Sequence, residues 1–218
     1  MARQMAPYGS WKSPITTDFL VSQGVSLDAP MVDGHDVYWA EGRPQEGGRQ
    51  VIVRLTADGR RVDVNPMPFN ARTRAHEYGG GAYLAADGVV YFSNFEDQRL
   101  YRVTPGSEPQ AVTAPGEVRF ADFVLDSGRN RLIAVREDHG AGAHQAVSTL
   151  VAVSLDAEDH GIVLVAGNDF YAAPRLSPDG QKLCWLTWNH SNMPWDGTEL
   201  YVAAIRGDGS IGAATLVA

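Results

Sequence analysis

The stretch "GAYLAADGVVYFSNFEDQRLYRVTPGSEPQAVT", residues 81–113, contains four short strand patterns in succession. Each pattern is rich in β-branched or aromatic residues, and turn dipeptides such as Asp87-Gly88 and Pro105-Gly106 separate the patterns. A polar loop lies between the second pattern and the third. This arrangement predicts a sheet built from four consecutive strands.

The same unit occurs four times along the chain. Its other copies begin with "APMVDGHD" (29–36), "ADFVLDSGRN" (121–130) and "APRLSPDGQK" (173–182). The four units cover about residues 28–66, 79–113, 119–167 and 170–218. A spacing of roughly 40 to 50 residues with four strands per unit is typical of β-propeller blades. The sequence therefore predicts an all-β fold, a β-propeller of about four four-stranded blades over residues 28–218.

Residues 1–27 precede the first unit and form an N-terminal extension. Within it, "SPITTDFLVSQG" (13–24) has a helical pattern, with Ser13 as the N-cap, Pro14 in the first turn and Gly24 at the end. We expect one short helix between about residues 14 and 23.

The charge balance limits the possible partners. The chain has 18 Lys and Arg against 26 Asp and Glu, a formal net charge of −8. Because this charge repels phosphate groups, nucleic acid and anionic membranes are disfavoured as partners. The first residues lack the apolar core of a signal peptide, and no stretch approaches the roughly 20 apolar residues that span a bilayer. We expect a cytoplasmic location.

The segment "TRAHEYGGGAY" (73–83) places a histidine and a glutamate against three glycines. It has the composition of a catalytic or phosphate-holding loop. The innermost strands of a propeller crowd together around its centre, however, and glycine lets a backbone pass where a side chain would collide. We favour this second explanation for Gly79, Gly80 and Gly81.

Three other motifs are possible sites. "GDGSIG" (207–212) matches the dinucleotide fingerprint, which requires a following helix, and a blade turn fits its surroundings better. No G-x-S-x-G nucleophile elbow occurs, so no catalytic residue is assigned. "REDHGAGAH" (136–144) gathers Glu137, Asp138, His139 and His144, but this spacing is common in solvated loops. We therefore assign no metal site and no cofactor.

The segment "NHSNMPWDGTEL" (189–200) is expected to be a loop that joins two strands of the last blade. Asn192, Trp195 and Asp196 are interface candidates, because an exposed tryptophan often marks an interface. The same tryptophan could instead cover the edge of the blade. Both interpretations remain open at this point.

Four segments carry a family resemblance: "YGSWKSPIT", "RTRAHEYGGGAY", "VYFSNFEDQRLYRVT" and "FYAAPRLSPDGQKLCWLTWNHSNMPWDGTELY". They resemble the amino-terminal half of bacterial serine peptidases of the prolyl oligopeptidase family, in the branch of the dipeptidyl aminopeptidase and acylaminoacyl peptidase relatives. Members carry a propeller, commonly seven-bladed, and an α/β-hydrolase domain that holds a Ser-Asp-His triad. The propeller limits entry to peptides and small amides.

The resemblance implies a role without catalysis for this chain, because the sequence holds about four blades and no hydrolase domain. It would be the substrate-gating propeller portion of a serine peptidase acting on peptides or aminoacyl amides, and inactive alone. A peptide or small amide would bind only when a hydrolase domain is joined to it. The terminal blades would each lack a neighbour and expose apolar faces that a complete propeller would bury, so self-association through them is expected.

The resemblance also implies where the gate lies. Arg72, Arg74, His76, Glu77 and Tyr78 would face the active-site cavity. There Glu77 could hold a peptide's ammonium group and an arginine its carboxylate. The alternative is that these charges pair with one another.

Two further hypotheses come from other classes of protein. The chain could be a closed four-bladed module that binds a protein partner, although its one cysteine, Cys184, cannot close the ring with a disulfide. It could instead be a metal-dependent propeller enzyme such as a lactonase. That function needs carboxylates or amides recurring on the inner strands, and Asp122 is the only such residue near the start of one.

Overall fold

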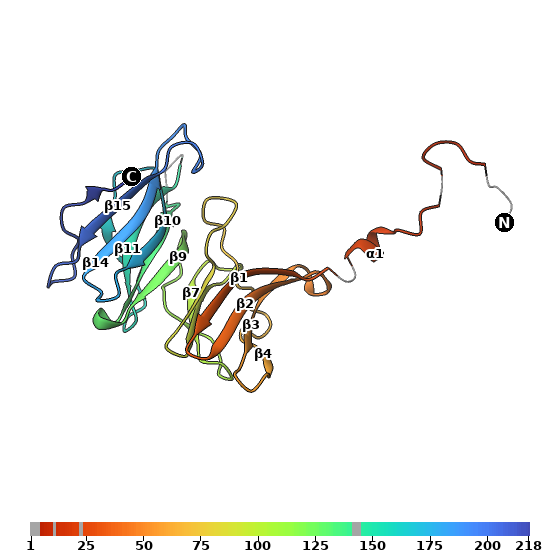
Figure 1. The fold of residues 1–218 in the computed structure, drawn as a ribbon, viewed down its shortest axis with the longest axis horizontal. Coiled ribbons are helices and arrows are strands. Elements are labelled where there is room, and N and C mark those ends of the chain that lie inside the picture. The colour runs from red at the N-terminus through yellow and green to blue at the C-terminus, as the bar shows by residue number, and fades with distance from the viewer. Residues whose placement is uncertain (1–4, 11, 22–23, 141–144) are drawn as a thin grey trace.

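The computed structural model describes residues 5–10, 12–21, 24–140 and 145–218. Within these residues, sixteen strands form four four-stranded antiparallel sheets, each in the order of the sequence (Figure 1). The chain is therefore all-β with the repeated sheets of a propeller, as the strand patterns predict. We call the sheets blades 1 to 4.

The strands of each blade follow one another along the chain. Blade 1 contains β1 (Ser26–Asp33), β2 (Asp36–Arg43), β3 (Arg49–Leu55) and β4 (Arg61–Asp63); blade 2 contains β5 (Tyr83–Ala86), β6 (Val89–Ser93), β7 (Leu100–Val103) and β8 (Gln110–Ala111). Blade 3 contains β9 (Val118–Asp126), β10 (Arg131–Asp138), β11 (Val147–Ser154) and β12 (Ile162–Val165); blade 4 contains β13 (Phe170–Leu176), β14 (Lys182–Trp188), β15 (Glu199–Ala204) and β16 (Thr215–Leu216). Short 3₁₀ helices lie at Pro44–Glu46 and Ser127–Arg129. The "GDGSIG" segment is a turn after β15, in which the Gly209 N–H donates to the Arg206 carbonyl.

The N-terminal helix is shorter than predicted. It spans Thr17–Val21 as α1, and residues 22–23 of the expected range lie outside the described residues. Its cap is Thr16, whose hydroxyl accepts a hydrogen bond from the Phe19 N–H at 3.1 Å. Ser13 was wrong as the cap because its hydroxyl accepts from the Ile15 N–H instead, in a turn before the helix. Figure 1 shows this extension running away from the blades.

The core lies between successive blades. Three clusters of buried apolar side chains join blade 1 to blade 2, blade 2 to blade 3 and blade 3 to blade 4; their largest fully buried members include Tyr38, Phe92, Phe120, Leu132 and Tyr171. Within the described residues, none of these clusters joins blade 4 back to blade 1. The blades therefore form an arc, with blades 1 and 4 at its ends (Figure 1).

The innermost strands β1, β5, β9 and β13 lie side by side in this order. The glycines before β5 pass close to β9: a Cβ on Gly81 would collide with the Asp122 carboxylate, and one on Gly80 would lie 3.0 Å from the Ala121 Cβ. Crowding between inner strands thus explains these two glycines, as predicted. Gly79 has a different reason, since its φ of +92° lies in the left-handed region.

Asp122 connects three blades. It lies at a bulge of β9 with a φ of +48°, and the bulges of β1 and β13 carry Ala29 and Ala173 at +49°. One carboxylate oxygen of Asp122 accepts a hydrogen bond from the Gly81 N–H, and the other accepts from the Ala173 N–H at 3.1 Å. This carboxylate is therefore a structural link and is occupied by backbone donors.

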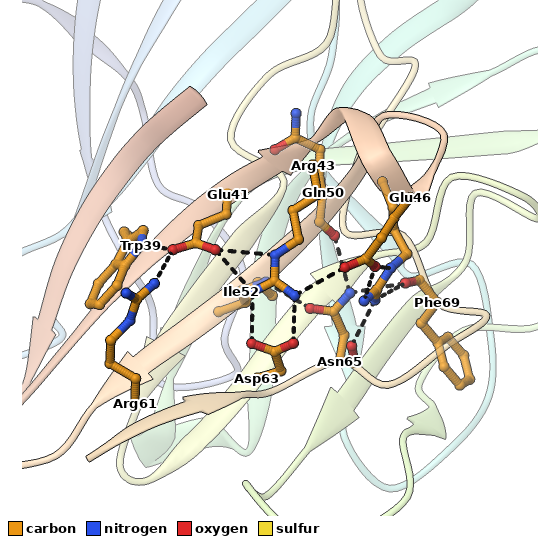
Figure 2. A network of polar contacts seen from close by, with 11 residues as sticks. Trp39, Glu41, Arg43, Glu46, Gln50, Ile52, Arg61, Asp63, Asn65 and Phe69 are labelled. Carbon is orange, nitrogen blue, oxygen red and sulfur yellow. Dashed lines mark hydrogen bonds and ion pairs between the residues drawn. The ribbon is translucent and has the colours of Figure 1, made fainter. Parts of the chain in front are cut away.

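A charged network covers the face of blade 1 that is turned away from blade 2 (Figure 2). Trp39, Glu41 and Arg43 alternate along β2 with Tyr38 and Ala40 of the first core cluster, so they lie on the opposite face. The Arg43 guanidinium binds Asp63 through two hydrogen bonds of 2.6 and 2.8 Å and also contacts Glu41. This face of a terminal blade is charged, where an apolar face was expected.

The corresponding face of blade 4 is apolar. Leu183 and Trp185 of β14 pack in the third core cluster, so Cys184 and Leu186 point to the opposite face. Their cross-strand partners are Val202 and Leu200, and all four side chains are half-buried. The two ends of the arc therefore differ in chemistry.

Candidate functional site

A cavity of about 450 Å³ lies where the connection from β4 to β5 meets the ends of blades 3 and 4. Its walls include His76, Glu77 and Tyr78 from the connection, Glu137 and His139 from blade 3, and Phe170, Trp188 and His190 from blade 4. Three separate parts of the chain thus build one pocket, which has the size of a small-molecule site.

The imidazole of His76 is buried in this wall, with 4% of its side chain exposed. Its ring centroid lies 5.7 Å from those of Tyr78 and Trp188 and 6.1 Å from that of Phe170. Among the described residues neither ring nitrogen has a hydrogen-bond partner, although Nδ1 is 3.3 Å from the Glu137 carboxylate. Such unpaired buried nitrogens are uncommon.

Glu137 supplies a buried carboxylate beside this imidazole. Its side chain is 6% exposed, and Oε1 accepts a hydrogen bond from the His76 backbone N–H at 2.6 Å. Oε2 lies 3.3 Å from Nε2 of His139. In the described part of the chain no Lys or Arg forms an ion pair with Glu137, so its only cationic partners are histidines when they are protonated.

The sequence interpretation missed Glu137 by assigning it to a solvated loop. The residue lies in β10, where strand alternation places it on the same face as Ile133 and Val135 of the third core cluster. That alternation was readable in "LIAVRED" and would have indicated a buried position. His144 of the same motif lies outside the described residues.

Glu77 points away from the buried imidazole and pairs with Arg119. The Arg119 guanidinium donates to the Glu77 carboxylate at 2.7 Å and to the Arg74 carbonyl at 2.9 Å. This hydrogen bond and the charge of Arg119 hold the pKa of the Glu77 carboxyl below its usual range. Glu77 is therefore ion-paired, and its partner Arg119 is not one of the five residues predicted to face the active-site cavity.

Arg72 and Arg74, the two arginines predicted to face the active-site cavity, lie against the ring of Phe95 instead. The guanidinium carbons of Arg72 and Arg74 lie 5.0 and 4.3 Å from the centroid of Phe95, within cation–π range. The structure therefore brings His76, Glu77 and Tyr78 together at the cavity and places Arg72 and Arg74 against blade 2.

Backbone strain is concentrated at the same segment. His76 and Glu77 have consecutive φ angles of +55° and +63°, a left-handed conformation that costs non-glycine residues about 1–3 kcal/mol each. Strain of this kind clusters at functional sites, where the surrounding structure maintains it. In this segment the strained backbone directs the His76 side chain into the cavity wall and the Glu77 side chain to the surface.

The loop between β14 and β15 forms the rim of the cavity. Asn192 lines it, whereas Trp195 is 76% exposed and Asp196 accepts a hydrogen bond from the Met193 N–H at 3.0 Å. The tryptophan therefore covers little of its own blade. Whether it meets a partner remains a prediction.

The described residues contain neither a metal-binding cluster nor a membrane-spanning helix. No group of three or more His, Cys, Asp and Glu side chains there has an arrangement that could hold a metal ion. In the same residues, no helix has the length and apolar composition needed to cross a membrane.

The arc of four-stranded antiparallel blades defines the chain as part of a β-propeller, and comparison with known proteins narrows the class. No protein-family model matches the chain, and neither does any curated protein. Among solved structures it is similar to a Mycobacterium tuberculosis puromycin-hydrolyzing peptidase, with 41% identity and a TM-score of 0.87 over 99% of this chain. It is also similar to a puromycin hydrolase, with 35% identity and a TM-score of 0.86 over 98%.

The chain spans about a third of these two proteins, 36% and 35% of their respective lengths. A structure of prolyl endopeptidases matches at 12% identity and a TM-score of 0.62, which bears on the fold alone. The chain is homologous to the propeller part of peptidases of the prolyl oligopeptidase family, as its sequence motifs predict.

Proposed function

We propose that this chain is the substrate-gating propeller portion of a serine peptidase that acts on peptides or aminoacyl amides. The observation that carries the proposal is the cavity at His76–Tyr78, which three separate parts of the chain build. The chain is 41% identical to the part of a peptidase that it matches. Two similar proteins are named for hydrolysis of puromycin, which contains an aminoacyl group in amide linkage. Small amides are therefore the substrate class we propose.

In this proposal the chain binds small substrates and excludes larger ones, and a separate hydrolase domain cleaves the amide bond. The sequence has no nucleophile elbow, so the reacting serine would belong to a hydrolase domain joined to the propeller. The strained segment at His76 and Glu77 would hold the cavity open toward that domain. The Glu77–Arg119 ion pair would fix the outer side of the segment.

Replacing the matching third of the Mycobacterium tuberculosis peptidase with this chain tests the proposal. The hybrid should hydrolyse phenylalanine p-nitroanilide and short peptides, and a fluorophosphonate probe should label its serine. Labelling reports whether the hydrolase domain is folded. A labelled hybrid that cleaves long unfolded polypeptides as readily as short amides would contradict a gating role.

The location of the protein is a separate proposal. We infer a cytoplasmic location because no stretch of the sequence approaches the roughly 20 apolar residues that span a bilayer. Fractionation of cells that express an epitope-tagged copy tests it, and recovery of the tag in the membrane or secreted fraction would contradict it.

A further inference from the structure

We propose that β12, the outer strand of blade 3, pairs edge to edge with β12 of a second copy of this chain. The inference goes beyond the proposed function and does not depend on it, because none of the described residues that line the cavity at His76–Tyr78 belongs to β12. Blade 3 lies within the arc, so this edge is also distinct from the faces of the two terminal blades.

The outer strand of each blade has one side that no further strand of its sheet occupies. In the described part of the chain β12 pairs with β11 alone, in an antiparallel register that sets Ile162 opposite Ala152 and Val163 opposite Val151. The backbone N–H and C=O groups on its other side are therefore available to another strand. Natural proteins prevent such pairing by making edge strands very short or charged, or by covering them.

Three of the four outer strands have one of these protections, and β12 has neither a short length nor a charge. β4 carries Arg61 and Asp63, which form ion pairs with Glu41 and Arg43. β8 and β16 have two residues each. β12 has four residues, with the sequence IVLV, all apolar and three of them β-branched. Among the described edges, that of blade 3 is therefore the one best suited to accept another strand.

The side chains of β12 add exposed apolar surface to this free edge. Ile162 is 74% exposed and Val163 is 47% exposed. The two side chains point to opposite faces of the sheet, because neighbours in a strand alternate. Among the described outer strands, the remaining exposed large apolar side chain is that of Leu216 in β16, at 52%. A strand that paired with β12 would therefore make apolar contacts on both faces.

The segment around β12 is suited to pairing with itself. Two copies related by a two-fold axis perpendicular to the sheet would pair antiparallel, with Val163 or Leu164 opposite its own counterpart. The segment 161–166, GIVLVA, contains no ionisable side chain, so neither register sets like charges opposite one another within it. Since a net charge of −8 makes two copies repel, an uncharged edge is the surface on which they can approach.

The test is hydrogen exchange of the 218-residue chain, followed by mass spectrometry, at low and at high protein concentration. Edge pairing would give hydrogen-bond partners to amides of residues 162–165 that face solvent in the monomer. We expect exchange in this segment to slow by about fivefold or more at high concentration. Exchange in residues 61–63, the charged edge of blade 1, should be the same at both concentrations. Exchange in residues 162–165 that does not depend on concentration would overturn the proposal.

Light scattering of variants locates the contact between the two copies. Blade 4 also has an apolar face, so the masses are compared in a chain that carries Val202→Lys, which places a charge on that face. In this background we expect the mass to rise with concentration toward twice that of the monomer. Val163→Lys should abolish the rise, because a charge in the middle of the edge opposes pairing. Leu216→Lys, on the outer strand of blade 4, should leave it unchanged.

A dimer that persists after Val163→Lys would show that β12 is not the contact and would overturn the proposal. If Val163→Lys does not melt cooperatively, Ile162→Lys takes its place, because a side chain that is 74% exposed can be changed with little effect on the core. The exchange measurement needs no variant, so it decides on the unchanged chain in either case.

Discussion

The carboxylate of Asp122 accepts a hydrogen bond of 3.1 Å from the backbone N–H of Ala173, and so connects the innermost strands of blades 3 and 4. Its other oxygen accepts from Gly81 before blade 2. We expect Asp122→Ala to leave two backbone donors unpaired and to destabilise the chain by about 2 kcal/mol. Thermal denaturation should show a fall in Tm of roughly 4–8 °C.

Asp156→Ala is the matched control, because Asp156 is exposed and no side-chain contact of its carboxylate is seen. Its Tm should stay within about 1 °C of that of the unchanged chain. Equal melting of both variants would show that the link through Asp122 contributes nothing to stability.

Gly81→Ala tests the crowding between inner strands. The added methyl group would overlap the Asp122 carboxylate, so we expect a loss of about 2 kcal/mol or more in the free energy of unfolding. Gly207→Ala is the control, since a Cβ there meets nothing within 4 Å and its φ is not left-handed. Chemical denaturation that gives equal stability for the two variants would contradict the crowding.

The features of the fold that depend on local sequence pattern could be predicted from the sequence. Alternating strand residues and turn dipeptides predicted the four blades, and the glycine triplet predicted close inner strands. Pairings across the fold were not readable, because Glu77 and Arg119 lie 42 positions apart and spacing in a sequence carries no information on such contacts. For the same reason the sequence could not show that Glu137, Phe170 and Trp188 meet the predicted His76–Tyr78 segment at one cavity.

The charged face of blade 1 predicts sensitivity to acid. The hydrogen bonds from Arg43 lower the pKa of the Asp63 carboxyl. Burial alone would raise the pKa of Glu41, but its bonds with Trp39 and Arg43 lower it overall. Because the folded pKa values lie below the unfolded ones, this stabilisation is present above about pH 4 and is lost as the pH falls through the folded values.

Arg43→Met should therefore reduce the difference in stability between about pH 7 and pH 3, measured by urea denaturation at each pH. Arg60→Met removes an exposed pair with Asp58 and serves as the control. The same pH dependence in Arg43→Met as in the unchanged chain would show that this network does not govern acid stability.

We propose that self-association of this chain uses the apolar face of blade 4. Val202→Lys places a charge on that face, and light scattering should show a smaller mass at high protein concentration. Ala157→Lys at an exposed position of blade 3 should leave the assembly intact. A monodisperse monomer for the unchanged chain at all concentrations would contradict the proposal.

The central claim is that this propeller portion presents the His76–Tyr78 segment to the substrates of a peptidase. Its most direct measurement is kcat/KM of the hybrid peptidase for phenylalanine p-nitroanilide after Tyr78→Ala, a change at a side chain that is 65% exposed. We predict a decrease of about tenfold, equivalent to about 1.4 kcal/mol, with an unchanged rate of labelling by the fluorophosphonate probe. An unchanged kcat/KM together with unchanged labelling would contradict the account, because the segment would then lie away from the substrate.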